Sequence, residues 1–194
     1  MLPAKHSMAG FSLLEMAVAS ALSMMVLTML VHLLMAGQRA AVSRATQLML
    51  AQDVQDAWRM LSADLRRAGY QMQSGGPLRL NGSEDTVHVT EMQCFVMRYE
   101  LSDGAVVKAY YHEDGELRVR SSGAVFTSPE QACHGGQALL DSRWMRVTDW
   151  QVQSVSWSHG RQQGQQLQFS LSVQALDGSV SHHEDMTLNL RNPS

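Results

Sequence analysis

The chain has 194 residues and a formal net charge of −3. This length suits one domain, or a smaller domain with an appendage. The near-neutral balance gives no sign of the basic surface that nucleic acids require. Two cysteines exclude a dense disulfide framework and a four-cysteine zinc site. Charged residues make up 17%, below the roughly 25% of an average soluble protein, which points to an uncharged segment.

That segment lies near the N-terminus. Residues 16–35 contain no Asp, Glu, Lys or Arg. About 20 residues at 1.5 Å each reach roughly 30 Å, the thickness of a hydrocarbon core. The run is longer than the roughly 7–15 apolar residues of a secretory signal, although Met35-Ala36-Gly37 keeps a cleaved signal open as an alternative. The sequence therefore predicts a retained transmembrane helix.

One carboxylate, Glu15, stands at the start of the apolar run. A carboxylate at the centre of a membrane helix costs roughly 2.5–3.5 kcal/mol, and less near the end of the span. Such a residue predicts a function and needs a partner. The alternative is a plain signal anchor in which Glu15 reaches the interface.

Beyond Gly37 the residues become polar but remain helix-forming. Apolar residues then recur every three or four positions, at Ala51, Val54, Trp58, Leu61, Leu65 and Ala68. This spacing predicts an amphipathic helix, and Gly69 is a typical residue to follow its end. Because no proline lies between Phe11 and Gly69, we expect one helix of about 85–90 Å. Its second half would pack on the downstream domain, with a coiled-coil seam as the alternative.

From Gln71 onward the pattern becomes that of strands. Asp-Gly pairs at 103–104, 114–115 and 177–178 favour two-residue type I′ turns. Residues 167–175 and 180–190 alternate clearly, and residues 150–157 alternate with one slip that indicates a bulge. Residues 121–143 indicate a long loop that could include a helical turn. The predicted fold class is α+β, a long N-terminal helix packed on an antiparallel β-sheet.

Few residues of the sequence indicate a metal site, a catalytic site or a cofactor site. His182 and His183 form the densest histidine pair, but neighbouring residues of a strand point to opposite faces, so we expect no metal site. No dense carboxylate loop for calcium, P-loop, nucleophile elbow or HExxH motif occurs, and we expect neither catalysis nor a cofactor. Trp144, Trp150 and Trp157 are expected in the core of the sheet rather than at a ligand.

The N-terminal segment Gly10-Phe11-Ser12-Leu13-Leu14-Glu15, followed by the apolar run, resembles the signal of type IV prepilins and type II secretion pseudopilins. The resemblance implies that prepilin peptidase cleaves between Gly10 and Phe11 and that Phe11 is then N-methylated. It also implies that Glu15 pairs with the N-terminal amine of a neighbouring subunit during assembly.

A second resemblance lies at the end of the predicted helix. The segment Asp64-Leu65-Arg66-Arg67-Ala68-Gly69-Tyr70 is similar to a stretch of the minor pilins called PilW and of prepilin peptidase-dependent protein B. The pseudopilin GspJ of type II secretion has a similar helix end. These resemblances imply a minor type IV pilin that helps to initiate pilus assembly with other minor and major pilins. The alternatives are a GspJ-type pseudopilin and a signal-anchored periplasmic domain.

The resemblance implies a single-pass protein of the inner membrane with a periplasmic C-terminal domain, which later joins the pilus fibre or its tip. The expected parts are a leader at 1–10, a transmembrane half-helix at 11–36, an amphipathic half-helix at 37–69 and a β-sheet domain at 70–194. In such an exported domain, Cys94 and Cys133 are expected to form a disulfide, with two buried free thiols as the alternative. A DNA-uptake role would need a basic stripe, and the arginines are scattered, so no nucleic acid is expected as a partner.

Overall fold

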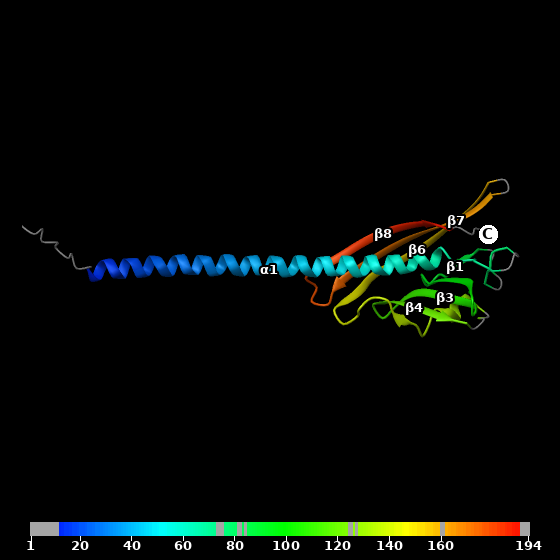
Figure 1. Ribbon diagram of the computed structural model, residues 1–194, viewed down its shortest axis with the longest axis horizontal. Coiled ribbons are helices and arrows are strands. Elements are labelled where there is room, and N and C mark those ends of the chain that lie inside the picture. The colour runs from blue at the N-terminus through cyan, green and yellow to red at the C-terminus, as the bar shows by residue number, and fades with distance from the viewer. Residues whose placement is uncertain are drawn as a thin grey trace, which may run out of the picture. The chain divides into compact units, whose positions relative to one another are not determined.

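The computed structural model describes residues 12–72, 76–80, 83, 85–123, 126, 128–159 and 162–190. The expected processing site, Gly10 and Phe11, lies outside these residues. The chain forms two compact units, Met1–Arg44 and Ala45–Ser194. Helix α1 (Leu13–Leu65) contributes residues to both (Figure 1).

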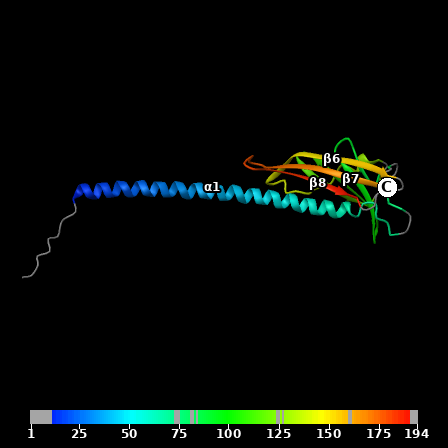
Figure 2. The same ribbon diagram turned by 90° about the horizontal axis from the view of Figure 1, so that it is seen from above.

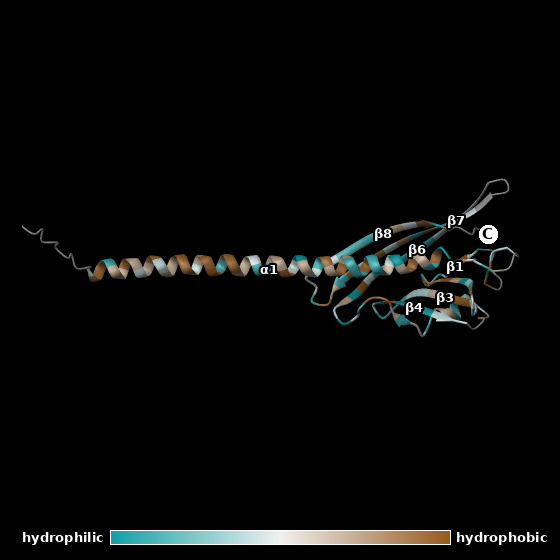
Figure 3. Cartoon of the chain, viewed as in Figure 1, coloured by the Kyte–Doolittle hydropathy of each residue, from teal (hydrophilic) through white to brown (hydrophobic). Residues whose placement is uncertain are grey.

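The part of α1 in the first unit is exposed and strongly hydrophobic, as Figure 3 shows. By length and composition this helix could cross a membrane. Its hydroxyl side chains donate hydrogen bonds to carbonyls one turn earlier: Ser20 to Ala17 (2.9 Å), Ser23 to Ala19 (2.8 Å) and Thr28 to Met25 (2.8 Å). Hydrocarbon offers no partner for a hydroxyl, so this internal bonding suits a helix in a bilayer.

The part of α1 in the second unit packs on the sheets through one face, as the helical spacing predicted. Its buried residues are Leu50, Val54, Ala57, Trp58, Leu61, Asp64 and Leu65. The predicted stripe is confirmed except at its start, where Leu50 is buried and Ala51 only partly so. The helix ends at Leu65, and turns continue to Gly69, which has the positive φ (74°) expected after a helix.

The first sheet follows the helix in the sequence. Its antiparallel strands are β1 (Val87–Val89), β2 (Phe95–Leu101), β3 (Gly104–Glu113), β4 (Glu116–Ser122) and β5 (Gln137–Ala138), in that spatial order. A short 3₁₀ helix, η1 (Pro129–Ala132), lies in the segment predicted as a long loop. The sequence pattern did not predict β5, because a strand of two residues has no detectable alternation.

The second sheet is an antiparallel meander of β6 (Met145–His159), β7 (Gln162–Ala175) and β8 (Ser181–Asn189). Figure 2 shows the sheets on one side of the C-terminal part of α1. The α+β class and the helix-on-sheet packing are therefore confirmed. The strands form two sheets, where the alternation pattern had suggested a single one.

Aromatic side chains join the helix to both sheets within the second unit. Trp58 of α1 stacks on Trp150 of β6, with ring centroids 6.1 Å apart. Phe95 of β2 lies 5.3 Å from Phe169 of β7 and stacks on Tyr110 of β3 at 5.0 Å. These contacts make one core from residues that lie far apart in the sequence.

Of the three type I′ turns predicted at Asp-Gly pairs, the one between β3 and β4 is confirmed. The predictions for the β2–β3 and β7–β8 connections were wrong. The β3–β4 turn is the predicted type I′ form, because Asp114 and Gly115 both have positive φ between the paired Glu113 and Glu116. In the β2–β3 turn Leu101 pairs with Gly104, so the two loop residues are Ser102 and Asp103 and not the predicted pair at 103–104.

The β7–β8 connection is longer than two residues, and Ala175 N–H donates to Val180 O at 2.9 Å. Here the pairing of the long strands, not the Asp-Gly pair, sets the loop length.

The predicted bulge in residues 150–157 is also misplaced. The register of β6 shifts between Val147 and Asp149 and is regular beyond Asp149. Val152 points into the core, whereas Val155 and Trp157 lie on the opposite, exposed face. The prediction of a core role therefore holds for Trp150 and fails for Trp157.

Candidate functional site

The first candidate site is the start of α1, where Glu15 lies in the first turn of the helix. Its carboxylate is exposed among the exposed side chains of Leu13, Leu14 and Met16. A negative charge there is favoured by the helix dipole. The first Lys or Arg of α1 after Glu15 is Arg39, about 36 Å further along the helix axis. The helix itself therefore offers Glu15 no nearby basic side chain.

The second candidate feature is the disulfide between Cys94 and Cys133, whose Cα atoms are 6.1 Å apart. Both residues are buried in a small apolar cluster that includes Val96, Tyr111 and Ala132. The bond joins the residue just after η1 to the residue just before β2. The sequence prediction of this disulfide is in agreement with the structure.

Arg120 of β4 fixes the same loop without a covalent bond. Its guanidinium donates hydrogen bonds to the carbonyls of Gln131 (2.9 Å) and His134 (2.7 Å). It also lies over the ring of Phe126, 4.9 Å from the centroid. The loop after β4 is thus held by the disulfide and by Arg120, and its end at Gly136 also bonds to Arg118 (3.1 Å) and Tyr111 (2.6 Å).

The third feature, which the sequence pattern did not predict, is a buried carboxylate at the end of α1. Asp64 is 4% exposed and belongs to the segment 64–70 that resembles minor pilins. It accepts hydrogen bonds from the Lys108 ammonium and the Tyr110 hydroxyl, and a longer one from the Tyr99 hydroxyl at 3.5 Å. A detectable signal existed, because Asp64 lies on the apolar face of the helix, beside Leu61 and Leu65.

Asp64 alters the acidity of the two tyrosines. Burial, then the hydrogen bond to Asp64, raises the pKa of Tyr110 well above its ordinary value of 10. Burial and the Asp64 charge also raise the pKa of Tyr99. Both hydroxyls are therefore neutral at physiological pH and donate to the Asp64 carboxylate. The cluster attaches the end of α1 to strands β2 and β3.

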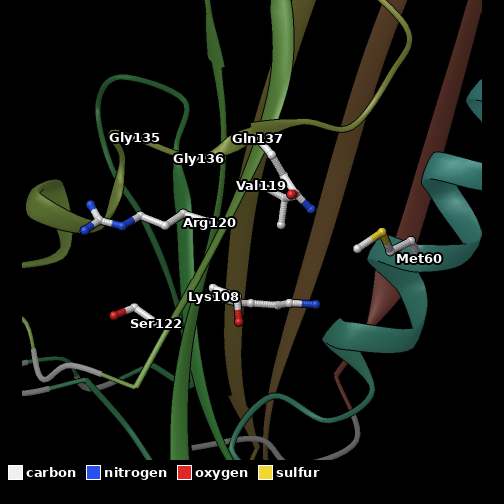
Figure 4. Close-up of a pocket in the computed structure, with 9 residues that line it drawn as sticks. Met60, Lys108, Val119, Arg120, Ser122, Gly135, Gly136 and Gln137 are labelled. Carbon is white, nitrogen blue, oxygen red and sulfur yellow. The ribbon is translucent and has the colours of Figure 1, made fainter.

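A groove of about 610 Å³ lies beside this cluster, between Met60 of α1 and strands β3 to β5 (Figure 4). In Figure 4 Lys108 points toward the helix and Arg120 points away from it. The charge of Lys108 is matched by Asp64, and Arg120 binds the loop carbonyls. The cationic side chains of the groove, Lys108 and Arg120, are thus bonded to partners within the protein.

The histidine pair of β8 behaves as predicted for a strand. His182 faces inward and is partly buried, and His183 lies on the exposed face. Within the described part of the chain, no group of three His, Cys, Asp or Glu residues could hold a metal ion.

An exposed apolar helix with one carboxylate at its start, whose later turns pack on antiparallel sheets, defines a pilin-like protein. The model of the prepilin peptidase-dependent protein B family matches residues 43–191, which is more than half of the chain. The chain therefore belongs to this family, a structural family of pilin-like proteins that prepilin peptidase processes. No curated protein and no solved structure gives a significant match to the chain.

Proposed function

We propose that the protein is a minor type IV pilin that helps to initiate pilus assembly. The observation that carries this proposal is the family match, which includes the helix end at 64–70, together with the carboxylate of Glu15 ahead of the apolar helix. A subunit of this kind must be stable both in a bilayer and in a fibre. An apolar helix with one carboxylate that a partner can neutralise meets both requirements.

In this proposal prepilin peptidase cleaves the chain between Gly10 and Phe11, and Phe11 is N-methylated. The new amine of one subunit then pairs with Glu15 of a neighbour. Two opposite charges that meet in a low-dielectric medium attract strongly, so the pairing would direct assembly. The helix near residues 11–36 would span the inner membrane, with residues 70–194 in the periplasm.

The first test is the intact mass of the full chain, purified from membranes with and without co-expressed prepilin peptidase. Loss of residues 1–10 and gain of one methyl group support the proposal. An unprocessed chain beside an active peptidase contradicts it and favours a signal-anchored periplasmic domain. As a matched pair, Gly10→Val should block cleavage, whereas Ala9→Val should not, because the peptidase requires a small residue only next to the scissile bond.

A second candidate is a minor pseudopilin of type II secretion, of the GspJ type, because the resemblance at the helix end applies to both. Cross-linking of the processed protein in cells separates the two. Capture of pilus subunits supports the pilin. Capture of secretion pseudopilins alone supports the second candidate.

A further inference from the structure

The outer face of the second sheet has an unusual composition near the β6–β7 turn. The pairing register sets three rows there: Trp157 beside Gly164, then Val155, Gln166 and Asn189, then Gln153, Gln168 and Thr187. We call these eight residues the amide face. Its members point away from the core, which receives the alternate residues Val152, Leu167 and Leu188. None of the side chains of the amide face is ionisable.

Trp157 provides a flat aromatic surface on this face. It is 51% exposed, unlike Trp58 and Trp150, which are 4% exposed. A Cβ atom at Gly164 would lie 2.3 Å from Cζ2 of Trp157, so the indole rests on the glycine backbone. One side of the ring is therefore supported by β7, and a ligand can stack on the other side.

The amides beside Trp157 are ordered by hydrogen bonds with one another. Gln168 Nε2 donates to Gln166 Oε1 (3.5 Å), and Gln166 Nε2 donates to Asn189 Oδ1 (3.0 Å). Each side-chain amide has two N–H donors and two lone pairs, so the ladder leaves capacity for a ligand. A shallow hollow of about 300 Å³ adjoins it, lined by Gln151, Gln153 and Thr187 and, in the next row of the sheet, by the carboxylate of Asp185.

We propose that the amide face binds a neutral, β-1,4-linked glycan chain. A pyranose ring has an apolar C–H side, which would stack on Trp157, and a polar edge, which would bond to the amides of Gln166 and Gln168. The face of a sheet is extended, and so is a β-1,4-linked chain. The combination of an aromatic surface with a few orienting polar groups is typical of small-molecule and sugar sites.

The lack of cations and the small apolar area of the amide face argue against nucleic acid and protein as its ligands. Single-stranded nucleic acid also stacks on aromatic rings, but it requires cations for its phosphates, and the amide face carries none. A protein partner would need a larger apolar centre than Val155 and Trp157 provide.

The proposal does not depend on the pilin assignment, because the glycan would bind to a single subunit without assembly of a pilus.

The test is calorimetric titration of the full chain in phospholipid nanodiscs, with empty nanodiscs as the blank. The probes are the β-1,4-linked hexamer of N-acetylglucosamine and that of glucose. We expect saturable binding that Trp157→Ala weakens about tenfold, the equivalent of about 1.4 kcal/mol. Gln168→Ala should weaken it about threefold. The matched control is Leu176→Ala, since Leu176 is 52% exposed and lies in the turn after β7, at the opposite end of the sheet.

The outcomes separate clearly. If the N-acetylglucosamine hexamer binds more tightly than the glucose hexamer, its acetamido groups contact the side-chain amides. If the two hexamers bind equally, the pyranose ring alone is recognised. Both results support the proposal. Absence of binding by either hexamer, or equal binding by wild type and both variants, overturns it. Salt-sensitive binding of oligothymidylate without glycan binding overturns it in favour of nucleic acid. Self-association that Trp157→Ala abolishes, without glycan binding, overturns it in favour of a second copy.

Discussion

The carboxylate of Asp64, one residue before the end of α1, accepts a hydrogen bond from the ammonium of Lys108 on β3, and both groups are largely buried. A buried ion pair adds little net stability compared with an apolar pair, but loss of one partner leaves an uncompensated charge. The pair therefore favours one position of the helix on the sheet over others. The Tyr110 hydroxyl strengthens this preference by donating to the same carboxylate.

Replacement of Asp64 by Ala should lower the free energy of unfolding of the second unit by about 3–5 kcal/mol, because Lys108 remains buried without its partner. The double variant Asp64→Ala/Lys108→Met should lose less. Denaturant unfolding in micelles, followed by tryptophan fluorescence, measures both. The control is Asp56→Ala, which removes an exposed pair with Arg59 and should cost about 0–1 kcal/mol. Equal losses for the two single variants would contradict the role of the buried pair.

Alkaline pH should destabilise the second unit through Tyr110. Its pKa is raised in the folded state, whereas an unfolded tyrosine ionises near pH 10. Above that pH the unfolded chain binds fewer protons than the folded one, so stability falls as pH rises, by up to about 1.4 kcal/mol per pH unit for this group. Below pH 10 the contribution is fully present. Unfolding measured from pH 8 to 11 should show a shallower decline in Tyr110→Phe than in the wild type, and an equal decline in both would contradict this role of Tyr110.

Removal of the disulfide should lower the free energy of unfolding by about 4 kcal/mol on the chain-entropy estimate, because the two cysteines are 39 residues apart. Cys94→Ser/Cys133→Ser and chemical reduction of the wild type should agree. The arginine contacts of Arg120 remain in both cases, so limited proteolysis should cut the loop after β4 sooner while the core stays protected. Proteolysis at an unchanged rate would mean that the hydrogen bonds of Arg120, Arg118 and Tyr111 hold the loop without the disulfide.

Glu15→Val should leave membrane insertion intact and abolish incorporation into the pilus, because the substitution removes an unfavourable charge from the span together with the proposed partner of a neighbouring amine. The measurement compares membrane fractions with sheared pili by immunoblot. Glu15→Asp keeps the charge and should retain part of the incorporation. Normal levels of Glu15→Val in pili would refute the pairing role.

The periodicity of the sequence predicted much of this fold for a local reason. Side chains at helical spacing, such as Val54, Trp58 and Leu61, must share one face of a helix whatever they contact. Alternation from Leu167 to Ala175 likewise placed every second side chain of β7 in the core. The candidate residues Glu15, Cys94 and Cys133 were visible because their residue types are exceptional in their surroundings.

Local rules failed where long-range pairing decides. The register of β7 on β8 set the length of their connection against the Asp-Gly signal at 177–178. A slip in alternation looked like a bulge near Val155, whereas the tertiary structure places Val155 and Trp157 on the outer face of a regular strand.

By itself, the sequence determined the helix, the α+β class and the resemblance to pilins, because hydrophobic period and short motifs are properties of neighbouring residues. Only the tertiary structure decided that the strands divide into two sheets, that Asp64 meets Lys108 and Tyr110, and that Trp157 rests exposed on Gly164. These relationships join residues of different elements. They depend on strand register and on how the helix packs, which no local pattern of side chains records.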